Sequence, residues 1–546
     1  MNNANFFYNK PQNEHVNDYK PGSKERKALI ETLNDLAERV TEIPIIINGK
    51  EIFTGKTGEV LNPGNKKVIA RYHMAGTEHI KEAVDAAMEA HKIWSTISWV
   101  ERLSINLKVA ELISTKYRYM INAATMLGQG KNAYQAEIDA VCETVDFLRF
   151  NAYYVSQIYN EQPLSVNEIL NRTENRPLEG FVFAVSPFNF TAIASNLVMA
   201  PVILGNVVLW KPATTSLLSN YLLMQIFMEA GMPAGVINFI PGQGALIGDE
   251  VLKSKHLAGI HFTGSNATFN HLWKGVAANL DTYRSYPRVV GETGGKDFVF
   301  VHASSDPREV ATALVRGAFE YQGQKCSAAS RAYIPVSLWP TVKGHMANTM
   351  SEIKVGEVTD FQNFVNPVID ANAFQRIKNY IDYAAQAKDA EILHGGTYND
   401  TNGFYIQPTV ILTSNPHFKT MEEEIFGPVL TIYVYEDAKY EETLRLCDET
   451  SPYALTGAIF SNDRLAMLKA CSILRYAAGN FYINDKPTGA VVGQQPFGGS
   501  RASGTNDKAG SYLNMLKWIS PRTIKENFLP PSDYKYAFMT ENKCRF

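Results

Sequence analysis

Residues 206–240 read NVVLWKPATTSLLSNYLLMQIFMEAGMPAGVINFI. The apolar runs Asn206–Trp210 and Val236–Ile240 at the two ends have the length and composition of buried strands. Between them, apolar residues recur with the spacing of one helix face: Leu218, Leu222 and Ile226. Gly231 and Pro233 mark the end of this helix. A strand, a helix and a second strand in this order predict a βαβ unit in a mostly parallel sheet.

The same pattern extends on both sides of this unit. Phe181–Val185 and Ala258–Phe262 are further apolar runs, and a helical stripe follows over residues 269–280. A second set of predicted strands comprises Phe298–His302, Arg331–Val336, Val429–Val434, Thr456–Phe460 and Asn480–Ile483. The helical stretches between these strands lie near residues 307–322, 371–387 and 462–477. The sequence therefore predicts an α/β protein with two doubly wound domains.

The remaining segments have weaker patterns. Residues 1–45 are polar, and we interpret them as a surface lead-in with one helix near Ala28–Val40. Apolar residues over Glu101–Tyr159 recur at steps of three and four, which predicts two long amphipathic helices. Residues 505–546 are irregular and contain three prolines, so we expect them to pack on a neighbouring surface.

The composition argues against several classes of protein. The 546 residues carry a net charge of −3, which disfavours nucleic acid or an anionic membrane as the main partner. No apolar stretch approaches the ~20 residues of a membrane-spanning helix. The N-terminal sequence has neither a secretory nor an organelle-targeting pattern, so we expect a cytoplasmic location. Five cysteines without a Cys-x-x-Cys pair predict no disulfide and no metal site.

Cys326 and Glu292 are the strongest candidates for catalysis. Cys326 lies in the run GQKCSAAS of small and polar residues, which leaves room for an accessible thiol. A thiol attacks as the thiolate, so a catalytic cysteine needs a base or a positive environment. Glu292 precedes Cys326 by 34 residues in GETGGK, and a carboxylate there could activate water. On these residues alone, a buried structural cysteine and a solvent-exposed turn glutamate remain open alternatives.

Two polar residues follow predicted strands, where α/β sheets collect ligand-binding loops. Asn189 comes shortly after the first strand, and its amide could donate to an oxyanion; a turn-forming asparagine is the alternative. Lys211 directly follows Trp210 and is placed to meet a phosphate or ribose; an exposed loop lysine is the alternative. Residues 242–248 resemble a dinucleotide-binding fingerprint but place the last glycine one residue too far.

The order of these motifs resembles that of the aldehyde dehydrogenase superfamily. The matching motifs are SPFNF at 186–190, WKPA at 210–213, FTGS at 262–265, ETGGK at 292–296, GQKC at 323–326 and EIFGP at 424–428. They fall in family order over residues 45–520. More narrowly, GQKCSA at 323–328, NFYINDK at 480–486, QQPFGG at 494–499 and GTNDK at 504–508 are similar to the branch that oxidises L-glutamate γ-semialdehyde.

This resemblance implies a reaction and its catalytic residues. Cys326 attacks the aldehyde, the Asn189 amide and the Cys326 backbone N–H stabilise the oxyanion, and NAD⁺ accepts the hydride. Glu292 then activates the water that hydrolyses the thioester. The product is L-glutamate, and the reaction is the second step of proline catabolism.

The resemblance also implies binding residues. Those for NAD are Trp210 and Lys211 by the adenine-side ribose, Ser265 at the pyrophosphate, and Glu424 with Phe426 at the nicotinamide-side ribose. Ser186, Pro187 and Gly264 are further residues expected to bind NAD. Those for the semialdehyde are Ser327, Gly489, Ala490, Phe190, Phe497 and Glu143. Glu143 has a second interpretation, because with Asp139 and Asp146 it could form a solvated acidic helix face. Thr214 stands where many relatives have a ribose-binding glutamate, and Phe269 replaces a glycine near the pyrophosphate.

The implied fold is aldehyde dehydrogenase-like, with two α/β domains and a small β oligomerisation flap. We expect an NAD-binding domain over 1–159 and 179–291, a catalytic domain over 292–504, and a flap over 160–178 and 505–546. The flap implies a homodimer or a larger homo-oligomer, and a contact with proline dehydrogenase is a further expectation. Three alternatives stay open: another carboxylate-bearing semialdehyde as substrate, a cysteine acyl-hydrolase without a nicotinamide, and a fold that has lost activity.

Overall fold

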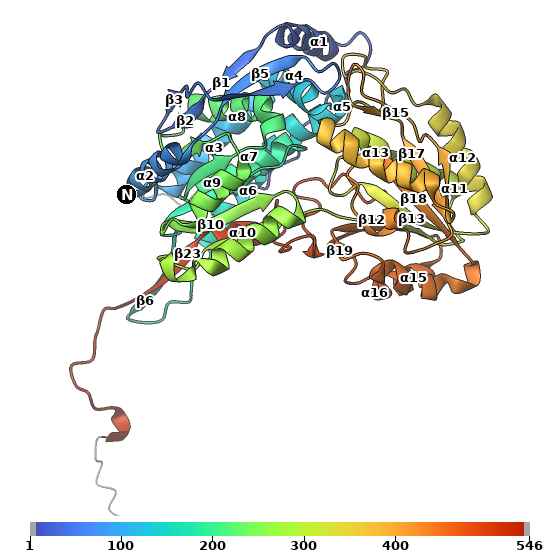
Figure 1. Ribbon diagram of the computed structural model, residues 1–546. Helices are drawn as coiled ribbons and strands as arrows, with labels where there is room; N and C mark the ends of the chain where they lie inside the picture. Colours follow the sequence, from blue (N-terminus) through green and yellow to red (C-terminus); the bar gives the residue numbers. More distant parts are fainter. Residues whose placement is uncertain (1–6, 540–546) are drawn as a thin grey trace, which may run out of the picture.

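The computed structural model describes residues 7–539, which form two α/β bodies side by side (Figure 1). The first body contains a seven-stranded sheet. In spatial order its strands are β11 (Arg288–Glu292), β10 (Leu257–Thr263), β7 (Phe181–Val185), β8 (Val207–Lys211), β9 (Ile237–Phe239), β2 (Ile45–Ile47) and β3 (Lys50–Ile52). The first five strands are parallel, and β2 and β3 continue the sheet in antiparallel pairing. The predicted βαβ unit is therefore confirmed at the centre of this sheet.

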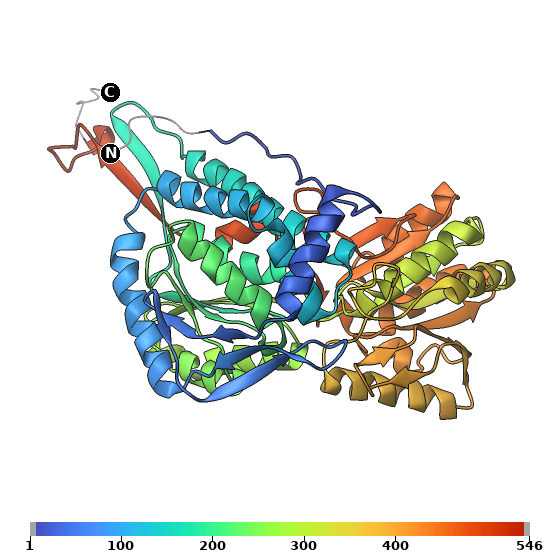
Figure 2. The ribbon, with the colours of Figure 1, turned by 90° about the horizontal axis from the view of Figure 1, so that it is seen from above.

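Helices cover both faces of the first sheet, and a small sheet of β1, β5 and β4 lies beside it (Figures 1 and 2). These strands are β1 (Thr41–Ile43), β4 (Thr57–Leu61) and β5 (Val68–His73). The helices include α1 (Lys24–Ala37), α2 (Thr77–Trp94), α7 (Thr191–Ile203), α8 (Leu217–Glu229), α9 (Gly244–Leu252) and α10 (Asn266–Ala278). The predicted helices near 28–40 and 269–280 correspond to α1 and α10.

The second body contains a second seven-stranded sheet. In spatial order its strands are β14 (Ala390–His394), β17 (Thr409–Thr413), β18 (Val429–Tyr435), β13 (Ala329–Pro335), β12 (Asp297–Val301), β20 (Thr456–Phe460) and β21 (Asn480–Ile483). All pairs are parallel except that of β14 with β17. Its helices include α11 (Pro307–Phe319), α12 (Trp339–Glu352), α13 (Ala371–Gln386), α15 (Tyr440–Glu449) and α16 (Arg464–Ile473).

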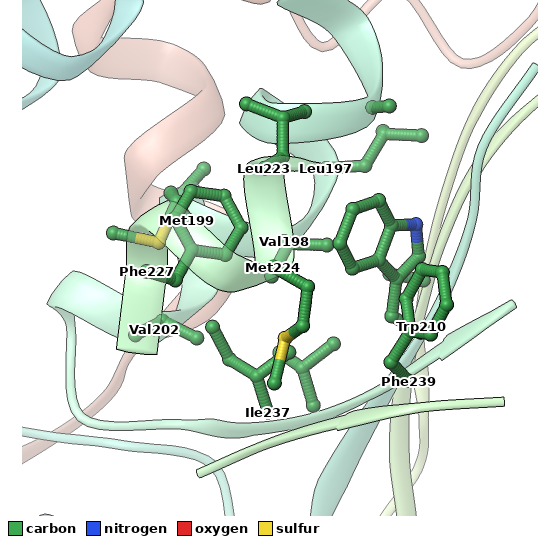
Figure 3. Packing of buried hydrophobic residues seen from close by; sticks show 14 of the residues in the cluster. Leu197, Val198, Met199, Val202, Trp210, Leu223, Met224, Phe227, Ile237 and Phe239 are labelled. Carbon is green, nitrogen blue, oxygen red and sulfur yellow. The ribbon is translucent and has the colours of Figure 1, made fainter. Parts of the chain in front are cut away.

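A continuous apolar core fixes the first sheet against α7 and α8. Trp210 is fully buried, with its ring centroid 5.1 Å from that of Phe239 and 6.2 Å from that of Phe227. Figure 3 shows Val198 and Met224 packed into the same cluster. Burying a large apolar side chain contributes about 1.5–3 kcal/mol, so this cluster holds β8 firmly in place. The loops that follow β7 and β8 are thereby anchored at the carboxyl ends of buried strands.

The prediction of two long helices over 101–159 is wrong. The structure has α3 (Trp99–Ser114), α4 (Arg118–Gln129), the short α5 (Ala133–Ala136), a π-helix at Glu137–Glu143, and α6 (Thr144–Asn160). Gly130, with φ 69°, ends α4 in the left-handed conformation. The π-helix directs the carboxylate of Asp139 onto the first backbone N–H groups of α7, at 3.0 Å from Thr191 and 2.8 Å from Ala192. Such π segments occur frequently at functional sites.

The flap expected from 160–178 and 505–546 corresponds in part to a two-stranded sheet. β6 (Ile169–Arg176) pairs antiparallel with β23 (Ser520–Asn527), and the pair projects away from the first body (Figure 1). Residues 505–519 do not belong to this sheet. Trp518 is fully buried with its ring 4.6 Å from that of His261, and α17 (Tyr512–Met515) packs on α6. Aromatic burial therefore draws this part of the expected flap into the first body. None of the helices within residues 7–539 is both long and apolar enough to cross a membrane.

Candidate active site

A cavity of about 440 Å³ lies where loops of the two bodies meet. It brings together eight of the residues that the sequence singled out: Cys326, Glu292, Ser327, Gly489, Ala490, Phe190, Phe497 and Glu143. Residues from the N-terminal segment, including Asn13 and Glu14, line another part of its wall. The cavity is therefore assembled from segments that lie far apart in the chain.

A strained turn presents Cys326 to this cavity. After α11, Tyr321 and Gln322 have left-handed φ values of 51° and 56°, and Gly323 follows with φ 65°. A Cβ on Gly323 would lie 2.2 Å from the carbonyl oxygen of Gly427, so only glycine fits there. The Gln322 side chain donates to two backbone carbonyls and accepts from the backbone N–H of Asn366. These contacts hold the turn in a conformation that most residues avoid.

The Cys326 thiol is buried, and burial raises its pKa well above the ordinary value. The nearby carboxylates of Glu292 and Asp297 raise this pKa further. The thiol is consequently protonated at neutral pH, and its attack on an electrophile requires a base. The remaining described cysteines, Cys142, Cys447 and Cys471, are free thiols; Cys544 lies outside the described residues.

Glu292 has the properties of such a base. It ends β11, and its backbone forms a bridge with Gly504. Burial raises the pKa of its carboxyl to about 7, and the positive charge of Lys508 acts in the opposite direction. The Oε1 atom is buried and accepts no hydrogen bond within the described chain. A buried carboxylate without a partner and with a pKa near neutrality is suited to accept a proton.

Asn189 lies beside the cysteine loop rather than on the cavity wall. Its side chain is buried, and its Nδ2 donates to the carbonyl oxygen of Gln324 at 3.0 Å. This contact fastens the loop after β7 to the residue two positions before Cys326. The second N–H of the same amide is not used in this bond. The structure thus brings Asn189 next to the loop that carries the nucleophile.

The opposite end of the cavity is polar. The hydroxyl of Ser327 lies 2.8 Å from that of Thr488, and Gly489 follows with φ 95°. Glu143, on the π-helix, has its pKa raised well above the ordinary value by burial and then by the charge of Asp139. The interpretation of 139, 143 and 146 as a solvated acidic face is therefore wrong.

The two neighbours of Glu143 are engaged in buried contacts. Asp139 forms an ion pair of 2.6 Å with the fully buried Lys131. Asp146 accepts hydrogen bonds from the Asn13 side chain and the Glu14 backbone. Glu143 is consequently the acid of this group that faces the cavity without a hydrogen bond or ion pair to the described residues.

The expected adenine-side residues, Trp210 and Lys211, lie at the carboxyl end of β8. Lys211 forms no ion pair within residues 7–539, and burial lowers its pKa to about 8. Its Nζ would lie 3.8 Å from a Cβ on Gly244, at the start of α9. The indole of Trp210 donates to the Ser186 hydroxyl at 3.0 Å inside the core. Any contact between Trp210 and a cofactor must therefore come from its backbone.

The N-terminus of α10 presents the expected pyrophosphate residues. Ser265 is exposed and caps the helix by accepting from the backbone N–H of Thr268, and Gly264 precedes it. Phe269, which replaces a glycine of the family motif, points inward: its ring stacks on Phe262 and abuts Gly291. This substitution therefore fills the core and leaves the helix N-terminus open to an anion.

The expected nicotinamide-side residues lie on the loop before β18. Glu424 accepts from the backbone N–H of Gly295 at 3.0 Å, and burial raises its pKa to about 7. Phe426 has a left-handed φ of 56°, and its ring meets that of Phe188 edge to face at 5.8 Å. Pro187 is half-buried in the same loop as Phe188.

Several cavity residues were given no role by the sequence. Lys508 lies in the GTNDK motif, and its Nζ donates to the carbonyls of Gly479 and Gly498, at 2.8 and 2.9 Å. Lys486 lies at the end of NFYINDK. The motif match could have pointed to both lysines. Asn13 lies in a polar segment without any pattern, so no sequence signal could have placed it at the cavity.

Comparison with known proteins shows which family the chain resembles. The model of the aldehyde dehydrogenase family matches residues 53–524. A protein of Dictyostelium discoideum named mitochondrial delta-1-pyrroline-5-carboxylate dehydrogenase is 53% identical over 535 residues, covering 97% of this chain and 96% of that protein. The human protein of the same name is 49% identical over 532 residues, covering 97% of this chain and 94% of its own.

Solved structures with a similar fold belong to proteins with related names. The delta-pyrroline-5-carboxylate dehydrogenase of Mycobacterium tuberculosis bound with NAD has a TM-score of 0.95 and 47% identity, covering 99% of this chain and 100% of its own. Proline utilization A from Bdellovibrio bacteriovorus has a TM-score of 0.90 and 29% identity, covering 97% of this chain and 54% of its own. The expected fold, two α/β sheets in the aldehyde dehydrogenase arrangement, is thereby confirmed. From its family match, its full-length relatives and its fold, this chain belongs to the aldehyde dehydrogenase family.

Proposed function

We propose that this chain oxidises L-glutamate γ-semialdehyde to L-glutamate with NAD⁺, the second step of proline catabolism. The relatives at about half identity over nearly the whole chain carry the name of this activity. The observation that carries the proposal is one cavity holding a buried thiol, a carboxyl with a pKa near 7 and a polar far end.

Residues of both bodies suit NAD. Lys211 and the open N-terminus of α10 offer a cation and helix N–H groups to the ribose and pyrophosphate. Glu424 is placed to bind the ribose next to the nicotinamide, with Phe426 beside it. Gly294 makes room for this carboxylate, because a Cβ there would lie 2.1 Å from Glu424 Oε2. When bound, NAD⁺ supplies the acceptor for the hydride that leaves the substrate carbon.

Cys326 forms the covalent bond to the substrate. Its sulfur attacks the aldehyde carbon while the thiol proton is transferred to a base, and the product is a thiohemiacetal. Glu292 suits this proton transfer because its pKa lies near neutrality. The free N–H of the Asn189 amide and the Cys326 backbone N–H are the proposed donors to the oxyanion. Each donor of this kind is worth about 3–4 kcal/mol in the transition state.

Glu292 acts again after the substrate carbon has been oxidised to a thioester. Its carboxylate removes a proton from water, and the hydroxide formed attacks the thioester carbon. The carbon–sulfur bond then breaks, which releases the carboxylic acid and regenerates the Cys326 thiol. Because Glu292 makes no competing hydrogen bond through Oε1, that oxygen is available to the water.

The polar end of the cavity is proposed to bind the amino acid part of the substrate. Ser327 and the backbone N–H groups of Gly489 and Ala490 would bind the α-carboxylate, and Glu143 would face the ammonium group. Phe190 and Phe497 would pack against the methylene groups between the two ends. This division matches a substrate with charges at one end and an aldehyde at the other.

The test is steady-state formation of NADH with purified protein. We expect NADH from L-glutamate γ-semialdehyde and NAD⁺, lower kcat/KM for semialdehydes of other chain lengths, and no NADH with Cys326→Ser. One methylene group in a fitted pocket changes kcat/KM by about 10- to 200-fold. If Cys326 hydrolysed esters at a rate that does not depend on NAD⁺, and no NADH were formed from any aldehyde, the chain would be an acyl-hydrolase. Measuring kcat/KM with NAD⁺ and with NADP⁺ decides which cofactor is preferred, a question that arises because Thr214 replaces the ribose-binding glutamate of many relatives.

The assembly and location are part of the same proposal. The β6–β23 pair exposes Leu170, and Leu164, Phe528 and Leu529 beside it are also exposed, which supports pairing with a second copy of the chain. The expected contact with proline dehydrogenase remains a prediction; this chain matches about half of a longer protein named proline utilization A. The expected domain boundaries remain a prediction. So does the cytoplasmic location, since the names of the slime mould and human relatives place those proteins in mitochondria.

A further inference from the structure

Lys486 lies at the polar end of the cavity, in the loop that follows β21. It is half-buried and lines the cavity, three residues before Gly489. A Cβ built on Gly489 would lie 3.2 Å from Lys486 Nζ. The ammonium group is therefore directly beside the backbone segment proposed to bind the substrate carboxylate.

The charge of Lys486 is balanced only in part by the described residues, because it acts on the Glu320 carboxylate together with two other cations. Glu320 is the carboxylate in this corner, and each of its oxygens is already engaged. Oε1 accepts from Arg316 at 3.0 Å, and Oε2 lies 3.3 Å from Lys325 Nζ. No carboxylate within residues 7–539 lies within 4.0 Å of Lys486 Nζ. Three cationic groups thus share one carboxylate at the cavity wall.

Three cations beside one carboxylate leave an excess of positive charge at the cavity wall, and an anionic ligand would supply the opposite charge. The adjoining hydroxyls of Ser327 and Thr488 are 2.8 Å apart and contribute only neutral dipoles. An anion seated here would meet the ammonium group, a hydroxyl and backbone N–H groups together. Hydrogen bonds between charged partners are about twice as strong as neutral ones.

We propose that Lys486 is a specificity-determining residue whose ammonium group binds the α-carboxylate of the semialdehyde beside Gly489 and Ala490. This inference rests on the proposed function and deepens it. It separates the two charges of the substrate: Lys486 selects the carboxylate, and Glu143 faces the ammonium. An uncharged aldehyde can still reach Cys326, but its binding is not strengthened by the charge of Lys486.

The test compares two substrates in matched variants. For each protein, kcat/KM is measured with L-glutamate γ-semialdehyde and with butanal, and the ratio of the two values is taken. We expect the ratio to fall about tenfold in Lys486→Met and in Lys486→Gln, mainly through the KM of the semialdehyde. Lys486→Arg should stay within about threefold, because it keeps the charge. Lys343→Met, on the exposed surface of α12, is the control and should leave the ratio unchanged.

The outcomes separate this inference from the function on which it rests. A wild-type preference for the semialdehyde that persists in both neutral variants overturns the role of Lys486 and leaves the proposed function standing. Equal use of both aldehydes by the wild type overturns the proposed function itself. Thermal unfolding of each variant shows whether it is folded. If the Lys486→Met protein is not folded, the Lys486→Gln and Lys486→Arg proteins still test the role of Lys486.

Discussion

The hydrolytic step should depend on pH in the neutral range because burial raises the pKa of Glu292 to about 7. Only the ionised carboxylate can take a proton from water. With this pKa, about one-tenth of Glu292 is ionised at about pH 6 and about nine-tenths at about pH 8. The thioester should therefore hydrolyse about tenfold faster at the higher pH. With an ordinary pKa of 4.5, the change would be only a few per cent.

The assay is rapid mixing with NAD⁺ and aldehyde, which separates the first NADH formed from the steady rate that follows. We expect the steady rate to rise about tenfold from about pH 6 to about pH 8 if hydrolysis limits turnover. Glu292→Gln should lower the steady rate by about 10²- to 10⁴-fold and abolish the dependence. Glu309→Gln, on the outer surface of α11, is the matched control. A steady rate unaffected by pH over this range, or a Glu292→Gln protein within tenfold of wild type, would refute the reasoning.

Three further changes test other contacts. Lys508→Met removes the charge that lowers the pKa of Glu292, so the acidic limb of the rate profile should move to higher pH, whereas Lys508→Arg should leave it in place. Gly294→Ala places a Cβ against the Glu424 carboxylate, and should raise the KM for NAD⁺ about tenfold while changing the KM for the aldehyde little. Asn13→Ala breaks the link between α6 and the loop near residue 492, and should raise the aldehyde KM about three- to tenfold with the NAD⁺ KM unchanged.

Strands of the parallel sheets were predictable because they are continuous apolar runs. Phe181–Val185, Thr456–Phe460 and Asn480–Ile483 were predicted with the bounds that the structure shows. Burial on both faces leaves no polar alternation, and turn residues mark the ends. β17 (Thr409–Thr413) was missed, although four of its five residues are buried, because its threonine ends shorten the apolar run. α12 was also missed, although its three buried residues, Val342, Met346 and Met350, recur at the four-residue spacing of one helix face.

The π-helix could not be seen in the sequence. Apolar residues over 133–160 recur at steps of three and four, and a π turn within such a stripe changes the spacing by a single residue. The effect of the π-helix appears only in the folded structure, where the carboxylate of Asp139 contacts Lys131 and the start of α7. Glu143 of the same π-helix faces the cavity. Local patterns carry no information on which of these acids is solvated.

The residues of the candidate site also differ in how well the sequence could predict them. Cys326 and Glu292 lie in short motifs that the family resemblance singles out, and the structure places both at the cavity. Asn13 bonds to the carbonyl of Val492, a partner 479 residues away, and no local pattern encodes that contact. Lys486 was within a recognised motif, yet its meaning depends on how Glu320 is shared by two other cations.

Burial raises the pKa of both groups proposed to act in catalysis, but the consequences differ. It raises the pKa of Glu292 into the range where the carboxyl can exchange protons at neutral pH, and it raises the pKa of the Cys326 thiol so far that the sulfur stays protonated. A thiolate therefore cannot accumulate in advance in the resting cavity. In the proposed reaction, the sulfur would lose its proton as the bond to the aldehyde carbon forms, which couples attack to proton transfer. The same carboxyl is then protonated and must release its proton before it can activate water, which orders the two half-reactions.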